Sequence, residues 1–215
     1  MALLKGKHSE RPSDAIMLSK EDAVIYQLKV MRGWEDKSDT FAFRYGGAFL
    51  ASISAATGIY INNHYRMKFK LHYYGRMSSY LPIVALPATL SLLFHTQFVT
   101  TEVTLPDKCI ACIETRASAI QAMVGCVFPL ILGPMAAIPL AMQYNTYDVP
   151  YITKEPLKVF KLVQKMTRPI GNILMTIFLG QAIVASIVTY FEAKSVLRVQ
   201  RKLAMLEDEL EHRRV

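Results

Sequence analysis

Four long stretches of this chain contain no Asp, Glu, Lys or Arg, and they constrain the fold more than any other feature. They cover residues 45–65, 77–101, 117–147 and 169–191, with charged segments between them. A helix rises about 1.5 Å per residue, so roughly 20 apolar residues cross a hydrocarbon core of about 30 Å. The sequence therefore predicts an all-α, polytopic membrane protein with four transmembrane helices and a charged amphipathic C-terminal helix.

One compact membrane domain with two appendages is the predicted organisation, because no loop is long enough to fold around a core of its own. The predicted parts are a polar N-terminal tail (1–43), a four-helix transmembrane domain (44–191, with spans at about 45–64, 78–100, 117–141 and 169–191) and an amphipathic C-terminal helix (192–215). Basic and acidic side chains are nearly balanced in the tail. This balance is not typical of a cleavable mitochondrial presequence, and the tail lacks the apolar region of a secretory signal.

The first span carries small residues at intervals of four, Gly47, Ala51 and Ala55, on one helical face. In lipid, hydrophobicity does not drive helices together, and small residues at this spacing let two backbones approach closely. We interpret this face as a helix-packing seam. The alternative is an alanine-rich helix with no special partner.

Polar side chains inside the spans include a histidine and several glutamines. His95 lies in the second span, and Gln121, Gln143 and Gln181 lie in the third and fourth stretches. A proton relay needs a chain of titratable groups, and no charged residue type occurs within the four stretches. We therefore expect these residues to form hydrogen bonds between helices or at the membrane interface, and not to handle protons or substrate.

The third stretch is too long for one straight span, because it would extend about 46 Å as a helix. Proline removes a backbone donor and clashes with the preceding turn, so Gly125, Pro129, Gly133, Pro134 and Pro139 supply candidate break points. A kinked span from about 117 to 140, followed by an interfacial segment, is expected. Broken helices line sites in transporters, so this span is the best argument for transport.

The fourth span continues into the charged C-terminal segment without Gly or Pro, so we expect one continuous helix. Beyond the membrane, apolar residues recur at alternating intervals of three and four, which is typical of a short coiled coil or an amphipathic docking helix. They are Val196, Val199, Leu203, Leu206 and Leu210. We interpret this segment as docking on another protein; the alternative is that it lies on a neighbouring helix or on the membrane surface.

Basic residues are concentrated in two loops on one predicted side of the membrane, 66–76 and 148–168, while both tails and the 102–116 loop share the other side. The positive-inside rule places the basic loops in the cytoplasm or the mitochondrial matrix. Anionic lipid head groups, including those of cardiolipin, are candidate ligands of their side chains. The residues are Arg66, Lys68, Lys70, Arg76, Lys158, Lys161 and Lys165. Because lipid explains such loops, nucleic acid is not an expected partner.

Two of the three cysteines, Cys109 and Cys112, form a C-x-x-C sequence before the third span. A structural zinc site usually needs two such pairs, so no metal is expected. Two interpretations stay open: a disulfide or redox pair, which an oxidising compartment would permit, and two small residues at the entry of a helix. No phosphate-binding loop or catalytic pair of titratable residues is recognisable, so neither a cofactor nor enzyme activity is expected.

The segment that follows is recognisable as a family pattern. Cys109, Cys112 and Arg116 precede a Gly/Pro-rich apolar helix that contains Gly125, Pro129, Pro139 and Tyr144. This pattern resembles the transmembrane protein 126 family of mitochondrial inner-membrane proteins. The resemblance covers about residues 41–200 and assigns Arg116 to the family-motif loop.

The resemblance implies a multi-pass protein of the mitochondrial inner membrane that acts as a non-catalytic scaffold, an assembly factor or chaperone for complex I of the respiratory chain. It implies action on the membrane arm, with the proximal ND2-containing module favoured, within the complex I intermediate assembly machinery. The implied partners are complex I membrane-arm subunits, the ECSIT adaptor, an acyl-CoA-dehydrogenase-like flavoprotein and other membrane assembly factors. The alternative function is a small-solute transporter or channel of that membrane, although no charge within the spans is present to bind or gate a solute.

Overall fold

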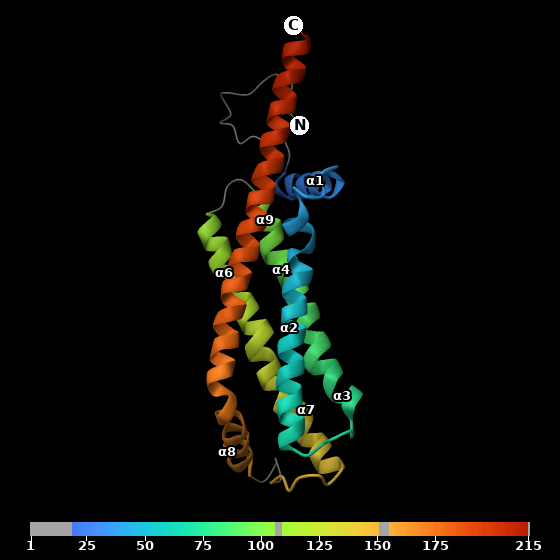
Figure 1. Cartoon of the computed structure of the whole chain (residues 1–215), viewed down its shortest axis with the longest axis vertical. Coiled ribbons are helices and arrows are strands. Elements are labelled where there is room, and N and C mark those ends of the chain that lie inside the picture. Colours follow the sequence, from blue (N-terminus) through green and yellow to red (C-terminus); the bar gives the residue numbers. More distant parts are fainter. Residues whose placement is uncertain (1–18, 106–108, 151–154, 215) are drawn as a thin grey trace.

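The long helices of this protein run side by side as an antiparallel bundle (Figure 1). The computed structural model describes residues 19–105, 109–150 and 155–214, and within these ranges it contains helices and no strand. The four charge-free stretches lie in α2 (Phe41–Lys68), in α3 (Arg76–Tyr80) with α4 (Leu86–His95) and α5 (Thr101–Val103), in α6 (Ile110–Ala122) with α7 (Phe128–Gln143), and in α9 (Gly171–Arg214). The all-α architecture is confirmed, and α9 is continuous as expected.

Three helical stretches are long and apolar enough to cross a membrane: Arg76–Val103, Ile110–Gln143 and Pro156–Leu210. α2 has sufficient length but is not among them, because it is less apolar. Its polar side chains are largely buried between helices; Ser54, Thr57, Asn62 and His64 are examples. The polytopic character is therefore confirmed, whereas the count of four spans depends on α2 and stays a prediction.

The proline-rich spans are interrupted by π-helical turns and do not break. Leu81–Ala85 and Thr96–Thr100 interrupt the second span, and Met123–Val127 interrupts the third. Pro87 and Pro129 each lie in the first turn of the α-helix that follows one of these π-helical turns, whose wider geometry accommodates a residue that has no amide donor. The third span also begins earlier and ends later than expected, at Ile110 and Gln143, because Pro134 and Pro139 lie inside α7 without ending it.

Two short helices at opposite ends of the bundle were not predicted. α1 (Lys20–Gly33) lies in the segment interpreted as a polar tail, and the Ser19 side chain caps it by accepting a hydrogen bond from the Asp22 amide. α8 (Pro156–Thr167) lies in the loop predicted over 148–168. Residues 1–18 of the predicted tail lie outside the described residues.

The buried core has one part near each end of the bundle. The part beside α8 includes Tyr65, Phe69, Ala137 and Leu174. The part beside α1 is formed by side chains of α1, α2, α5, α6, α9 and the Thr96–Thr100 turn, and includes Met31, Phe43, Val99, Val196 and Val199. α1 is therefore packed into the core near the two tails.

Candidate functional site

A chain of buried amides joins four helices in the middle of the bundle. Ser91 of α4 donates to Gln121 Oε1 of α6 at 2.7 Å, and Gln121 Nε2 donates to Gln181 Oε1 of α9 at 2.6 Å and to Ser54 Oγ of α2 at 3.0 Å. Gln181 Nε2 donates to Thr57 Oγ1 of α2 at 2.9 Å. All five side chains are buried. The interhelical role predicted for Gln121 and Gln181 is confirmed; the third glutamine of that prediction, at position 143, is exposed.

His95 of α4 forms a buried pair with Glu192 of α9. His95 Nε2 lies 2.9 Å from Glu192 Oε1, and the two side chains are 3% and 1% exposed. Glu192 Oε2 has no hydrogen-bond partner among the described residues. Gly46 of α2 leaves the space for this carboxylate, since a Cβ there would lie 2.6 Å from Glu192 Oε1. A proton relay needs a chain of titratable groups, and this pair supplies two of them.

Glu192 is a titratable partner that the four charge-free stretches do not contain. Glu192 directly follows the fourth charge-free stretch, and 97 positions separate it from His95 along the chain. Helix packing brings the two together, and local spacing gives no signal of it. His95 does make an interhelical contact, as expected, but with a carboxylate.

Near the N-terminal end of α2, the predicted seam faces the second span. Gly47 is buried, and a Cβ there would lie 3.1 Å from Leu92 Cδ1. Ala51 and Ala55 are half-buried. A much closer approach occurs at Gly58, where an added Cβ would lie 2.4 Å from the carbonyl oxygen of Ile83.

Asp39, in the connection between α1 and α2, attaches this connection to α9. Its carboxylate pairs with Arg198 Nη1 at 3.3 Å and with Lys202 Nζ, and it accepts a hydrogen bond from Trp34 Nε1 at 3.4 Å. The hydrogen bond from Lys202 is the main reason why the pKa of Asp39 lies below its ordinary value. The part of α9 that contains Arg198 and Lys202 is thus held by ion pairs as well as by packing.

The predicted docking face of α9 has a buried part and an exposed part. Val196 and Val199 are buried in the core that includes Met31 of α1, and Leu203 is partly buried against it. For Val196 and Val199 the docking assignment is wrong, because this chain's own helices bury them. Leu206 and Leu210 remain 50% and 56% exposed.

A groove of about 740 Å³ lies where this exposed part of α9 begins. It is lined by Gly33, Trp34, Glu35, Asp36, Lys202, Met205 and Leu206. The groove combines the end of α1 with the first exposed turn of the docking face. The exposed leucines and this groove together form one surface, which we call the α9 end surface.

Cys109 and Cys112 are exposed free thiols at the start of α6. A hydrogen bond from the Cys112 side chain lowers the pKa of the Cys109 thiol below its ordinary value. Arg116 of the same helix pairs with Glu102 of α5 at 2.7 Å. Both interpretations of the cysteines, a redox pair and a helix entry, stay open. No group of three or more His, Cys, Asp or Glu within the described ranges could hold a metal ion.

Arg66 corrects the prediction of lipid contacts. It is 5% exposed, and it donates to the carbonyl oxygens of His72 at 2.6 Å and Tyr74 at 3.0 Å and to Ser79 Oγ at 2.8 Å. A guanidinium group has five donors, and most of them here close the turn between α2 and α3. The other predicted lipid contacts are exposed and stay predictions: Lys68, Lys70, Arg76, Lys158, Lys161 and Lys165.

Together these features define a class: a polytopic, all-helical membrane protein with a hydrogen-bonded interior and distinct surfaces at its two ends. The family model described as Transmembrane protein 126 matches residues 25–202. The chain therefore belongs to the transmembrane protein 126 family, which confirms the resemblance found in the sequence.

Two relatives match over nearly their whole length. The chain is 38% identical to Transmembrane protein 126 of Drosophila melanogaster over 213 residues, which are 98% of this chain and 96% of the relative. It is 22% identical to Transmembrane protein 126A of Mus musculus over 204 residues, which are 94% of this chain and 98% of the relative. No solved structure matches.

Proposed function

We propose that this protein is a non-catalytic scaffold of the mitochondrial inner membrane that helps to assemble the membrane arm of respiratory complex I. Family membership supports the proposal through the role that the Cys109–Tyr144 pattern implies. The proximal ND2-containing module is the proposed site of action. The proposed partners are membrane-arm subunits, the ECSIT adaptor, the acyl-CoA-dehydrogenase-like flavoprotein, other membrane assembly factors and anionic lipids such as cardiolipin.

The α9 end surface is the observation that carries the scaffold proposal. α9 extends well beyond the other helices of the bundle (Figure 1), and Leu206 and Leu210 are exposed on that extension. Leucines repeated at this spacing are typical of a helix that pairs with another helix. The other half of the same face is already packed against helices of this chain, since Val196 and Val199 are buried in its core. We expect an amphipathic helix of an assembly partner to continue this packing along Leu206 and Leu210.

Native-gel separation tests the assembly role. The tagged full-length protein is solubilised from mitochondria in a mild detergent, and co-migrating proteins are identified by mass spectrometry. The proposal requires co-migration with complex I membrane-arm subunits and assembly factors. Migration of the protein without any of them would contradict it.

A pair of matched variants tests the α9 end surface. Leu206→Asp/Leu210→Asp should remove the co-purifying partners while the protein stays in the membrane. Ala204→Asp/His212→Asp is the control, because it adds two acidic residues to the other face of the same exposed helix. Equal partner retention by both variants would exclude docking through the leucines.

A small-solute transporter of the same membrane is the second candidate. The buried His95–Glu192 pair favours it, because ionisable residues among membrane helices often mark substrate or proton paths. Transport predicts a solute flux in proteoliposomes that Glu192→Gln abolishes, together with migration apart from complex I subunits. A scaffold shows no such flux.

A further inference from the structure

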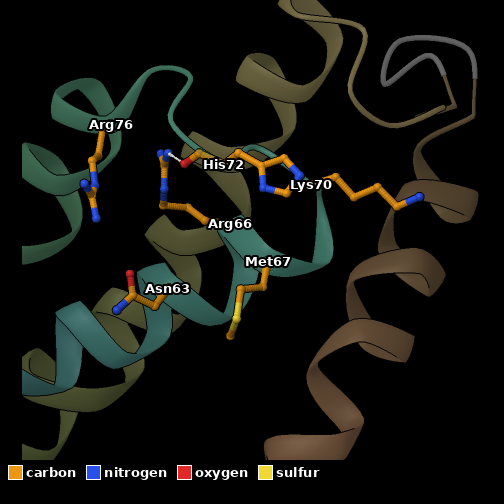
Figure 2. Close-up of a pocket in the computed structure, with 6 residues that line it drawn as sticks. All are labelled: Asn63, Arg66, Met67, Lys70, His72 and Arg76. Carbon is orange, nitrogen blue, oxygen red and sulfur yellow. Dashed lines mark hydrogen bonds between the residues drawn. The ribbon is translucent and has the colours of Figure 1, made fainter.

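A pocket of about 380 Å³ opens where α2 ends and α3 begins. Its lining consists of Asn63, Arg66, Met67, Lys70, His72 and Arg76 (Figure 2). Three of these side chains carry a positive charge, and no acidic side chain lines the pocket. In the described part of the chain, none of the three has a carboxylate partner. The pocket thus holds concentrated positive charge that no carboxylate of the described residues neutralises.

Three polar side chains of the pocket, those of Arg66, Arg76 and Asn63, have partners that hold them in place before any ligand binds. Arg66 is held by the turn that it closes, and the Arg76 guanidinium lies 5.9 Å and 6.0 Å from the ring centroids of Tyr73 and Tyr80. Tyr80 also donates to Asn63 Oδ1 at 2.7 Å, so the amide nitrogen of Asn63 is left to donate to a ligand. Figure 2 shows Arg66, Arg76 and Asn63 on one side of the pocket, while the Lys70 side chain extends away from them.

The turn itself has an unusual backbone that Arg66 stabilises. Lys70 and His72 adopt positive φ angles of 53° and 39°, which non-glycine residues seldom do. Arg66 donates to the carbonyl oxygen of His72 and to that of Tyr74. One buried arginine therefore holds Lys70 and His72 at the rim of the pocket.

Arg66 already donates within the turn, but Arg76, Lys70 and the amide nitrogen of Asn63 have no acceptor among the described residues. These donors suit an anionic ligand with several acceptor oxygens, and a phosphate group meets this description. The surroundings favour a lipid as its source. Tyr73, Met67, Met77 and Leu81 are 84%, 72%, 82% and 70% exposed beside the pocket, at the end of the charge-free helices. Aromatic and basic side chains together are typical of the head-group region, and exposed apolar side chains next to it suit acyl chains.

We propose that this pocket binds the phosphate of an anionic membrane phospholipid. Native mass spectrometry of the purified full-length protein tests the proposal, with phosphatidylglycerol as the anionic probe and phosphatidylcholine as the neutral comparison. Phosphatidylglycerol should bind with higher affinity. Lys70→Gln/Arg76→Gln should weaken its binding about thirtyfold, because each basic side chain near the surface contributes about a factor of five.

Lys194→Gln/Arg201→Gln is the matched control, because it removes the same charge from exposed positions of α9 that are not among the predicted lipid contacts. The control should bind phosphatidylglycerol as the wild type does. Equal weakening by both variants would show a general surface effect and overturn the proposal. Binding of phosphatidylglycerol no tighter than phosphatidylcholine, with inorganic phosphate binding in its place, would assign the pocket to a free anion and overturn the lipid assignment. Unchanged thermal unfolding of both variants shows that any loss belongs to the pocket.

Discussion

At the scale of single residues, the pair of His95 and Glu192 shows how strongly the interior depends on matched polar groups. Both side chains are buried, and the second carboxylate oxygen of Glu192 is already without a partner among the described residues. Removal of the imidazole would leave a buried carboxylate with no partner at all.

We therefore predict that His95→Leu lowers the free energy of unfolding by about 3–5 kcal/mol, the usual cost of breaking a buried ion pair on one side. The double variant His95→Leu/Glu192→Leu should recover much of this loss, because it removes both members of the pair. Thermal unfolding in detergent measures both. A double variant less stable than His95→Leu would mean that the pair is not coupled.

The thiol of Cys109 gives a prediction with a defined pH dependence. The hydrogen bond from Cys112 lowers its pKa, so more thiolate is present at neutral pH than in an ordinary cysteine. Cys112→Ala removes this donor, so the rate of maleimide labelling at Cys109 should reach its plateau at a higher pH than in the wild type. Cys112→Ser keeps a hydroxyl donor and should shift the profile less.

Mass spectrometry of the labelled peptide measures this rate. Identical pH profiles in the wild type and in Cys112→Ala would contradict the assigned hydrogen bond. Labelling of Cys109 only after addition of a reductant would instead show that the redox-pair interpretation is correct.

At the scale of helices, the backbone of α2 approaches the π-helical turn Leu81–Ala85 very closely at Gly58. An added Cβ at Gly58 would lie 2.4 Å from a backbone oxygen, which cannot move without shifting its helix. Gly58→Ala should therefore destabilise the protein by about 1–3 kcal/mol, as overpacking does. Gly180→Ala is the control, because nothing lies within 4 Å of its added Cβ and alanine favours a helix by up to about 1 kcal/mol. Equal melting temperatures for the two variants would contradict the close approach.

The sequence predicted the long helices well and the short ones poorly, and the reason is physical. A bilayer-length helix needs a long run without charge, and such a run is visible in any window of the chain. α1 and α8 instead mix charged and apolar residues over three or four turns, and only burial against other helices decides their structure. The cap at Ser19 and the acidic first turn of α1 were the local signals that could have revealed that helix.

The sequence predicted some of the site residues correctly, whereas others depend on helix packing that the sequence does not show. Gln121 and Gln181 were predicted because a polar side chain in a span needs a partner inside the protein. Arg66 was assigned to lipid because its sequence neighbourhood is that of the exposed Lys68 and Lys70, and only the fold of the turn buries it. The partner of His95 was missed because helix packing alone brings two residues so distant along the chain together.

At the scale of the whole molecule, α2 decides the number of membrane crossings. Ser38 precedes the first residue of this helix and Lys68 is its last residue, and both are exposed. In a background in which all three cysteines are replaced by serine, Ser38→Cys and Lys68→Cys should react with an impermeant maleimide from opposite sides of a sealed membrane. Reaction of both from the same side would show that α2 does not cross and that the chain has three spans.

The continuity of α9 has a geometric consequence for everything that meets its free end. Each residue of a helix turns the chain by about 100° and advances it by about 1.5 Å. α9 has no break between Gly171 and Arg214. The backbone that places Glu192 against His95 therefore also sets the direction in which Leu206 points around the helix axis and its position along that axis. Insertion of one residue after Glu192 would swing Leu206 and Leu210 about a quarter of the way round the helix. Insertion of seven residues would move both leucines about 10 Å along the helix axis and leave the direction in which they point almost unchanged.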